Sequence, residues 1–94
     1  MAAAPANATV YNYGCSNSFT GLKIWTTAGA EFCYAWDGNQ ASHVGDSNFW
    51  AEEICGGVNG GALYDDHWNY TGYFKPNDCH AGNGVRVRYI VFNK

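Results

Sequence analysis

Four cysteines constrain the fold of this 94-residue chain more than any other feature of its sequence. They form no CxxC pair, and this spacing favours two disulfide bonds over a zinc site. A domain of this length buries only about 60 to 65% of the surface that its unfolded chain exposes, so it gains from covalent links. Each bond can contribute roughly 3 kcal/mol. Disulfides form in oxidising compartments, and the sequence therefore predicts a secreted, extracellular protein. The four residues are Cys15, Cys33, Cys55 and Cys79.

The composition predicts an all-β domain. Aromatic residues make up 17% of the chain, charged residues only 14%, and there are 12 glycines, a profile typical of short strands and tight turns. The net charge of −3 gives no basic field for nucleic acid. No apolar run approaches the 18 or so residues of a membrane span. We expect a soluble monomer that binds no nucleic acid.

The N-terminal segment differs from the rest of the chain. Residues 1–8 are small, include Pro5 and have little to pack, so we expect a disordered leader followed by one domain over residues 9–94. The leader has neither the basic nor the apolar region of a signal peptide, which indicates the start of a mature chain.

The clearest strand pattern spans residues 21–38. Leu22 and Ile24 alternate with less apolar neighbours, as in a half-buried strand, and a small-residue turn follows at 26–29. Asp37-Gly38 suits a tight turn at the end of the return strand. That return strand places three aromatic residues on one face: Phe32, Tyr34 and Trp36.

Further strands are expected at residues 9–13, 49–55 and 85–92. The segment 49–55 fits a strand in which Trp50, Glu52 and Ile54 share a face, although one turn of helix is the alternative. The last strand is expected to place four residues on one face: Val85, Val87, Tyr89 and Val91.

The segments between these strands are rich in turn residues. Residues 39–48 and 75–84 are polar and predict turns, and the glycine-rich segment 56–61 predicts a turn or a crossing. The register of residues 62–74 does not follow from their pattern. A loose twofold repeat in this order predicts two four-strand halves, that is, a β-sandwich of paired Greek keys.

Phe19 and the segments LKIWTTAG (22–29), CYAWDG (33–38) and FWAEEICGGVNGGALYDD (49–66) resemble small secreted microbial βγ-crystallin-fold proteins, most closely the killer-toxin-like proteins of Streptomyces. The resemblance covers residues 15–66. It implies a single βγ-crystallin-like domain with two Greek-key motifs packed as a β-sandwich. It also pairs Cys15 with Cys33, which assigns the second bond to Cys55 and Cys79.

The same resemblance implies a function. It indicates a cytotoxic or antimicrobial protein, antifungal above all, whose partner is a microbial cell-surface component. A related protein of this fold inhibits extracellular metalloproteases, so inhibition of an extracellular protease is the alternative. A rigid loop within residues 56–62, or the loop before Cys79, would then face the protease.

Many βγ-crystallin domains bind calcium through loops with paired Asn/Asp and Ser/Thr residues. Here one loop keeps Asn39 and Ser42, and another keeps Asn77 and Asp78. These half-matches favour polar turns without a metal, so no cofactor is expected. A calcium-binding structural protein remains a third alternative.

Catalytic patterns are missing from the sequence. His43, His67 and His80 stand in loop-like segments without the spacing of HExxH, and no serine lies in a G-x-S-x-G context. We therefore expect a protein that binds rather than catalyses.

The segment 64–75 concentrates aromatic residues among polar ones. Such clusters serve either as recognition anchors or as part of a small core. Arg86 and Arg88 suit an anionic partner, or they guard the solvent face of an edge strand against aggregation. The candidate binding residues are Trp68, Tyr70, Tyr73 and Phe74.

Overall fold

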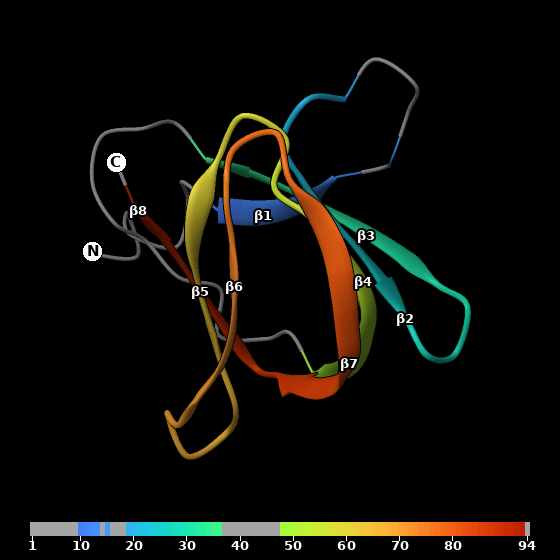
Figure 1. The fold of residues 1–94 in the computed structure, drawn as a ribbon, viewed down its shortest axis with the longest axis vertical. Coiled ribbons are helices and arrows are strands. Elements are labelled where there is room, and N and C mark those ends of the chain that lie inside the picture. The colour runs from blue at the N-terminus through green and yellow to red at the C-terminus, as the bar shows by residue number, and fades with distance from the viewer. Residues whose placement is uncertain (1–9, 14, 16–18, 37–47, 94) are drawn as a thin grey trace.

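The computed structural model describes residues 10–13, 15, 19–36 and 48–93. The predicted leader at 1–8 and the predicted turn at Asp37-Gly38 lie outside these residues. The described part of the chain contains eight strands and no helix, which confirms the all-β class (Figure 1). The strands are β1 (Val10–Tyr13), β2 (Leu22–Thr26), β3 (Glu31–Trp36), β4 (Phe49–Cys55), β5 (Gly60–Tyr64), β6 (Tyr70–Phe74), β7 (Cys79–Val87) and β8 (Tyr89–Asn93).

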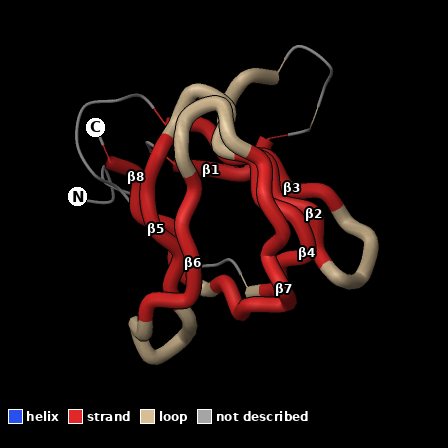
Figure 2. The backbone as a smooth tube through the Cα atoms, in the orientation of Figure 1, coloured by secondary structure: helices blue, strands red, loops and turns tan. Residues whose placement is uncertain are grey.

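The strands form two antiparallel sheets. A five-stranded sheet has the order β1-β3-β2-β4-β7, and a three-stranded sheet has the order β6-β5-β8 (Figure 2). After β4 the chain changes sheet three times, between β4 and β5, between β6 and β7, and between β7 and β8. The described strands therefore divide into five and three, and the two sheets do not correspond to two successive four-strand halves of the sequence.

The core lies between the two sheets. Leu22 and Ile24 on β2 are buried in alternation, as their sequence pattern predicts. Thr26 was expected to begin the turn, but it is the buried last residue of β2. Two ring pairs pack within it, Phe32 with Phe49 at a centroid distance of 5.1 Å and Phe74 with Phe92 at 5.2 Å. The remaining fully buried large side chains come from both sheets: Ile54, Leu63, Val87 and Ile90.

The segment 49–55 is a strand, but the prediction that Trp50 and Ile54 share a face is wrong. Ala51 pairs with Val85 while Glu53 pairs with Ala81, so the ladder between β4 and β7 is interrupted by a bulge. The bulge reverses the alternation of side chains along β4. As a result Ile54 is buried whereas Trp50 is exposed.

The C-terminal strands also differ from their prediction. The polar turn ends at Asp78, and β7 already begins at Cys79, so most of the segment 75–84 is strand. The expected single strand over 85–92 is broken at Arg88, where the chain leaves one sheet and enters the other. This break puts Ile90 in the core, whereas Tyr89 is only half-buried.

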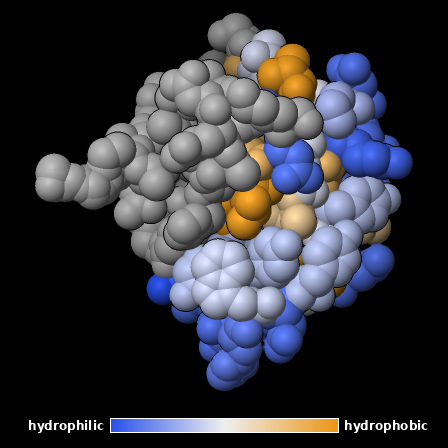
Figure 3. All heavy atoms as spheres, turned by 90° about the vertical axis from the view of Figure 1, so that its left-hand side faces the viewer, coloured by the Kyte–Doolittle hydropathy of each residue, from blue (hydrophilic) through white to orange (hydrophobic). Residues whose placement is uncertain are grey.

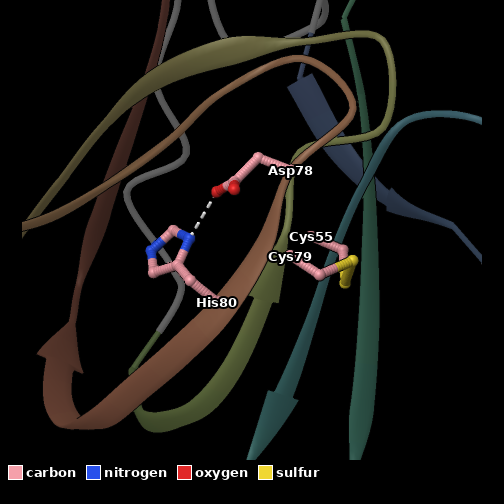
Figure 4. The surroundings of a disulfide bond; sticks show 4 residues. All are labelled: Cys55, Asp78, Cys79 and His80. Atoms are coloured by element: carbon pink, nitrogen blue, oxygen red, sulfur yellow. Dashed lines mark hydrogen bonds and ion pairs between the residues drawn. A yellow bond between two sulfur atoms is a disulfide. The ribbon is translucent and has the colours of Figure 1, made fainter.

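Both disulfide pairings agree with the prediction, because Cys15 is bonded to Cys33 and Cys55 to Cys79. The second bond joins directly paired residues of β4 and β7 (Figure 4). Cys33 is buried, while Cys79 is exposed. The two bonds therefore stabilise one interior and one surface position of the five-stranded sheet.

Three loops distant in sequence meet at Gly56 and Gly57. The backbone N–H of Val58 donates to the carbonyl of Thr20 at 2.9 Å, and the N–H of Asn77 donates to the carbonyl of Gly57 at 2.6 Å. Gly57 has a φ of 65°, and a Cβ there would lie 2.2 Å from the carbonyl oxygen of Thr20. Only glycine allows this approach.

Candidate binding surface

Tyrosine and tryptophan side chains gather on the outer face of the three-stranded sheet. Tyr64 on β5 pairs with Tyr70 on β6 and with Tyr89 on β8, so three tyrosines form a row across the sheet. Figure 3 looks onto the side that carries these strands, and pale side chains of intermediate hydropathy lie across its lower half, above blue, hydrophilic side chains at the bottom. We call the following residues the aromatic face: Tyr64, Trp68, Tyr70, Tyr73 and Tyr89.

A bulge brings Tyr70 and Tyr73 to the same face. Leu63 pairs with Gly72 and Tyr64 pairs with Tyr70, so Thr71 is an extra residue in β6. In a regular strand, side chains three positions apart point to opposite faces. With one bulged residue between them, both tyrosines are exposed, at 61% for Tyr70 and 40% for Tyr73.

Trp68 lies in the turn between β5 and β6 and is 47% exposed. Its ring stacks on Tyr89, with centroids 3.9 Å apart and planes 9° from parallel. Tyr64 lies beside it at a centroid distance of 5.4 Å, and Tyr70 meets Tyr64 edge to face at 6.1 Å. These contacts hold the rings in fixed positions.

The turn that carries Trp68 is closed by Asp65. Its Oδ1 accepts hydrogen bonds from the backbone N–H groups of His67 and Asn69, both at 2.9 Å. These bonds favour the ionised carboxylate, and the hydrogen bond from Asn69 is the largest cause of a lowered pKa at Asp65. The φ of Trp68 is 61°, a left-handed conformation that an ordinary side chain adopts only when its surroundings compensate.

The opposite end of the aromatic face is formed by Tyr73. Its ring stacks on the imidazole of His80 at a centroid distance of 4.3 Å. Nδ1 of His80 lies 2.8 Å from Oδ2 of Asp78 (Figure 4). Lys75 places its Nζ 5.6 Å from the centre of the Tyr73 ring. Tyr73 is thus held by charged and titratable neighbours, whereas Trp68 is held by other aromatic rings.

Three of the four candidate binding residues lie together on this face, namely Trp68, Tyr70 and Tyr73. Phe74 does not, because it is only 1% exposed and packs on Phe92 in the core. It follows Tyr73 directly in β6, so its side chain points to the opposite face of the sheet. Sequence reasoning missed the role of Tyr89, because only the chain break at Arg88 places that residue beside Trp68.

A groove of about 600 Å³ runs between β6 and β7 beside the aromatic face. Tyr70 and Tyr73 line one side, and His80 and Asn83 line the other. Both strands lie at the edges of their sheets. The groove therefore offers polar groups next to two exposed aromatic rings.

The structure describes only two of the four candidate calcium ligands. Asn39 and Ser42 lie outside the described residues. Asn77 and Asp78 lie in the turn before β7, where the Asp78 carboxylate is paired with His80. Within the described ranges, groups of three or more His, Cys, Asp and Glu side chains occur only around the two disulfides, whose oxidised sulfurs are not thiolate ligands: Cys15 with Glu31 and Cys33, and Glu53 with Cys55 and Cys79. Calcium binding stays a prediction.

Comparison with protein-family models, curated proteins and solved structures gave no match to this chain. The βγ-crystallin-like identity therefore stays a prediction, whereas the all-β architecture and the two disulfides are properties of the structure itself. The disulfides are consistent with an extracellular protein. Over the described residues, no helix has the length and apolar character that crossing a membrane requires.

Proposed function

We propose that this protein is a secreted, killer-toxin-like protein that acts against other microbes, fungi above all, by binding a component of their cell surface. It works by binding rather than catalysis, and the aromatic face is its binding surface. The βγ-crystallin-like Greek-key fold that the sequence resemblance implies is part of this proposal.

The observation that carries the proposal is the exposure of Trp68, Tyr70 and Tyr73 on one rigid face. Large apolar rings at the surface lose contact with water when a partner covers them, and tyrosine and tryptophan are enriched among residues that dominate binding energies. Ring contacts with Tyr64, Tyr89 and His80 hold these side chains in place before binding, which lowers the entropy cost of association.

Growth and cell-binding assays test this proposal. Oxidised protein is added to a panel of yeasts and filamentous fungi, and protein retained by washed cells is quantified. We expect growth inhibition and retention, with Tyr70→Ala and Trp68→Ala each reducing cell affinity about ten-fold or more. Val58→Ala, which alters an exposed apolar residue elsewhere, is the matched control. Absence of both retention and inhibition at high protein concentration would refute the proposal.

Inhibition of an extracellular protease is a second candidate, and Val58 is the observation that favours it. This side chain is 65% exposed in the turn after Cys55. The turn is held by the disulfide and by hydrogen bonds to Thr20 and Asn77. A rigid loop that presents one exposed apolar side chain can occupy a protease pocket without being cleaved rapidly.

Substitutions at Val58 and Tyr70 distinguish the two candidate functions. A thermolysin-type metalloprotease is assayed with the wild-type protein, Val58→Asp and Tyr70→Ala. Protease inhibition that is lost in Val58→Asp and retained in Tyr70→Ala would establish the inhibitor function. No inhibition by the wild-type protein would exclude this class of target.

A further inference from the structure

A second exposed aromatic group lies where β7 ends and β4 begins, at the lower end of the molecule in Figure 1. Trp50 pairs with Arg86 across these strands, and the guanidinium carbon of Arg86 lies 4.7 Å from the centre of the Trp50 ring. Nε of Arg86 donates to Oδ1 of Asn48 at 2.8 Å. Trp50 is 50% exposed. These contacts fix the orientation of a cationic group at the surface.

The charge of Arg86 is oriented but not neutralised. Its hydrogen-bond acceptor is a neutral amide, and the guanidinium forms no ion pair with any carboxylate of the described residues. A guanidinium that stacks on an aromatic ring can still bind a phosphate or carboxylate group through two parallel N–H donors. Arg86 is therefore prepared to bind an anionic group.

Arg88 continues this surface toward the aromatic face. Its guanidinium carbon lies 5.0 Å from the centre of the Tyr89 ring, and Tyr89 stacks on Trp68. The hydroxyl of Thr71 donates to the carbonyl of Arg86, and the N–H of Arg88 donates to the carbonyl of Tyr64, both at 2.8 Å. We call the following set the arginine–aromatic end: Trp50, Trp68, Arg86, Arg88 and Tyr89.

The arginine–aromatic end lies outside the groove between β6 and β7. The groove between β6 and β7 includes Tyr70 but none of the five residues of the arginine–aromatic end. The β5–β6 hairpin, which carries Trp68, projects from the body of the molecule (Figure 2). Half-exposed tryptophan rings beside arginine are the combination that favours the boundary between water and lipid.

We propose that the arginine–aromatic end binds the phosphate head groups of an anionic lipid surface. This inference rests on the proposed function, since it names the cell-surface component. The chain carries only five lysine and arginine residues at a net charge of −3, and two of them meet here. Two carboxylates, Asp65 and Asp66, lie in the turn that carries Trp68, so they oppose this contact and the two arginines must outweigh them.

Vesicle co-sedimentation tests the inference with the intact, oxidised protein. We expect binding to vesicles of phosphatidylcholine with phosphatidylglycerol, little binding to phosphatidylcholine alone, and loss of binding at high salt. Arg86→Gln should lower the partition coefficient about five-fold, which corresponds to roughly 1 kcal/mol for one basic residue at an anionic surface. Trp50→Ala should also weaken binding.

Matched variants and competitors decide the outcome. Lys23→Gln removes the same charge from β2, where Lys23 pairs with Cys55 at the opposite end of β4 from Trp50, and Val58→Ala removes apolar surface elsewhere. Equal losses in Arg86→Gln and Lys23→Gln would overturn the inference, because binding would then follow net charge alone. Absence of vesicle binding would also overturn it, including the case in which only isolated wall polysaccharide retains the protein.

The proposed function and this inference fail in different ways. Retention on cells without vesicle binding removes the lipid partner and leaves the proposed function in place. Vesicle binding without cell retention or growth inhibition supports the inference and removes the antimicrobial function. Inorganic phosphate that competes with vesicles at equal phosphate concentration would show a simple anion site and overturn the requirement for a lipid surface.

Discussion

The ring of Trp68 stacks on the ring of Tyr89 with 3.9 Å between their centroids, although the two residues lie 21 positions apart. The contact joins the β5–β6 turn to the first residue of β8. It also offsets the cost of the left-handed backbone at Trp68, whose φ is 61°. One ring pair thus fixes both the turn and the aromatic face.

A double-mutant cycle on this pair should reveal direct coupling. We expect Trp68→Ala and Tyr89→Ala to share a coupling free energy of about 0.5 to 1.5 kcal/mol, which is the usual worth of an aromatic pair beyond its buried area. Urea unfolding of the wild-type protein, both single variants and the double variant measures it. Strictly additive losses would show that the stacking contributes nothing to stability.

Gly57 should tolerate no side chain. Its φ of 65° and the 2.2 Å approach of a Cβ to the Thr20 carbonyl combine backbone strain with overlap, so Gly57→Ala should lose about 3 kcal/mol or more. Gly29 provides the control, since its φ is 91° but nothing lies within 4 Å of a Cβ. Gly29→Ala should lose only about 1 kcal/mol. Similar melting temperatures for the two variants would contradict the packing of the three loops.

The carboxylate of Asp65 should make stability depend on pH in the acid range. Its folded-state pKa is lowered from 3.8, first by the hydrogen bond from the backbone of Asn69. A group with a lowered pKa contributes its full stabilisation above the unfolded-state value and loses it as pH falls through the folded-state value. The difference in stability between the wild-type protein and Asp65→Asn should therefore be largest near neutral pH and should disappear at acidic pH.

Urea unfolding at a series of pH values measures this difference. Asp66→Asn is the control, because it removes the same charge from the neighbouring position of the same turn. A stability difference between the wild-type protein and Asp65→Asn that stays constant down to strongly acidic pH would contradict the role of the ionised carboxylate.

Removal of either disulfide should lower stability by about 3 kcal/mol. The bonds close intervals of 18 and 24 residues, so the entropic contributions should be similar. The double variants Cys15→Ala/Cys33→Ala and Cys55→Ala/Cys79→Ala, compared by urea unfolding, measure each bond. Alkylation of the unfolded, unreduced wild-type protein should add no mass, because every cysteine is paired.

Calcium should leave the melting temperature unchanged. A single native-state site at a hundred times its Kd would add about 2.7 kcal/mol, which corresponds to a shift of roughly ten degrees or more in a domain of this size. Melts in EDTA and in millimolar calcium distinguish the two cases. A clear rise with calcium would establish a site and would make Asn39, Ser42, Asn77 and Asp78 the first residues to substitute.

Local patterns predicted the elements whose pairing is regular. The alternation of Leu22 and Ile24 is confirmed because β2 follows the two-residue period at these positions. The two-residue period predicted the wrong face for Trp50 and Tyr89, because the pairing of their strands is irregular. A bulge opposite β7 reverses β4, and the break at Arg88 moves the chain to another sheet. Both features depend on partner strands distant in sequence, which single-sequence periodicity does not contain.

The aromatic face was predicted only in part, again because the local sequence does not contain the pairing of distant strands. Composition alone marked residues 64–75 as rich in aromatics, and Trp68, Tyr70 and Tyr73 are exposed there. The burial of Phe74 and the inclusion of Tyr89 required the register of β6 and β8 against β5. The lipid-binding role proposed for Arg86 depends on its contact with Trp50. The sequence pattern of residues 49–55 predicted that Trp50 shares a face with Ile54, so it did not indicate this contact.

After β4 the chain alternates between the two sheets. The protein therefore cannot be divided at that point into two fragments that fold independently. A fragment ending at Cys55 would keep four strands of the five-stranded sheet and lack every strand of the facing one, so its apolar face would have no cover. The complementary fragment would carry β7 without β4, its only partner in the five-stranded sheet. Split-protein complementation should consequently require both pieces at once, and recombination at the midpoint should yield insoluble products.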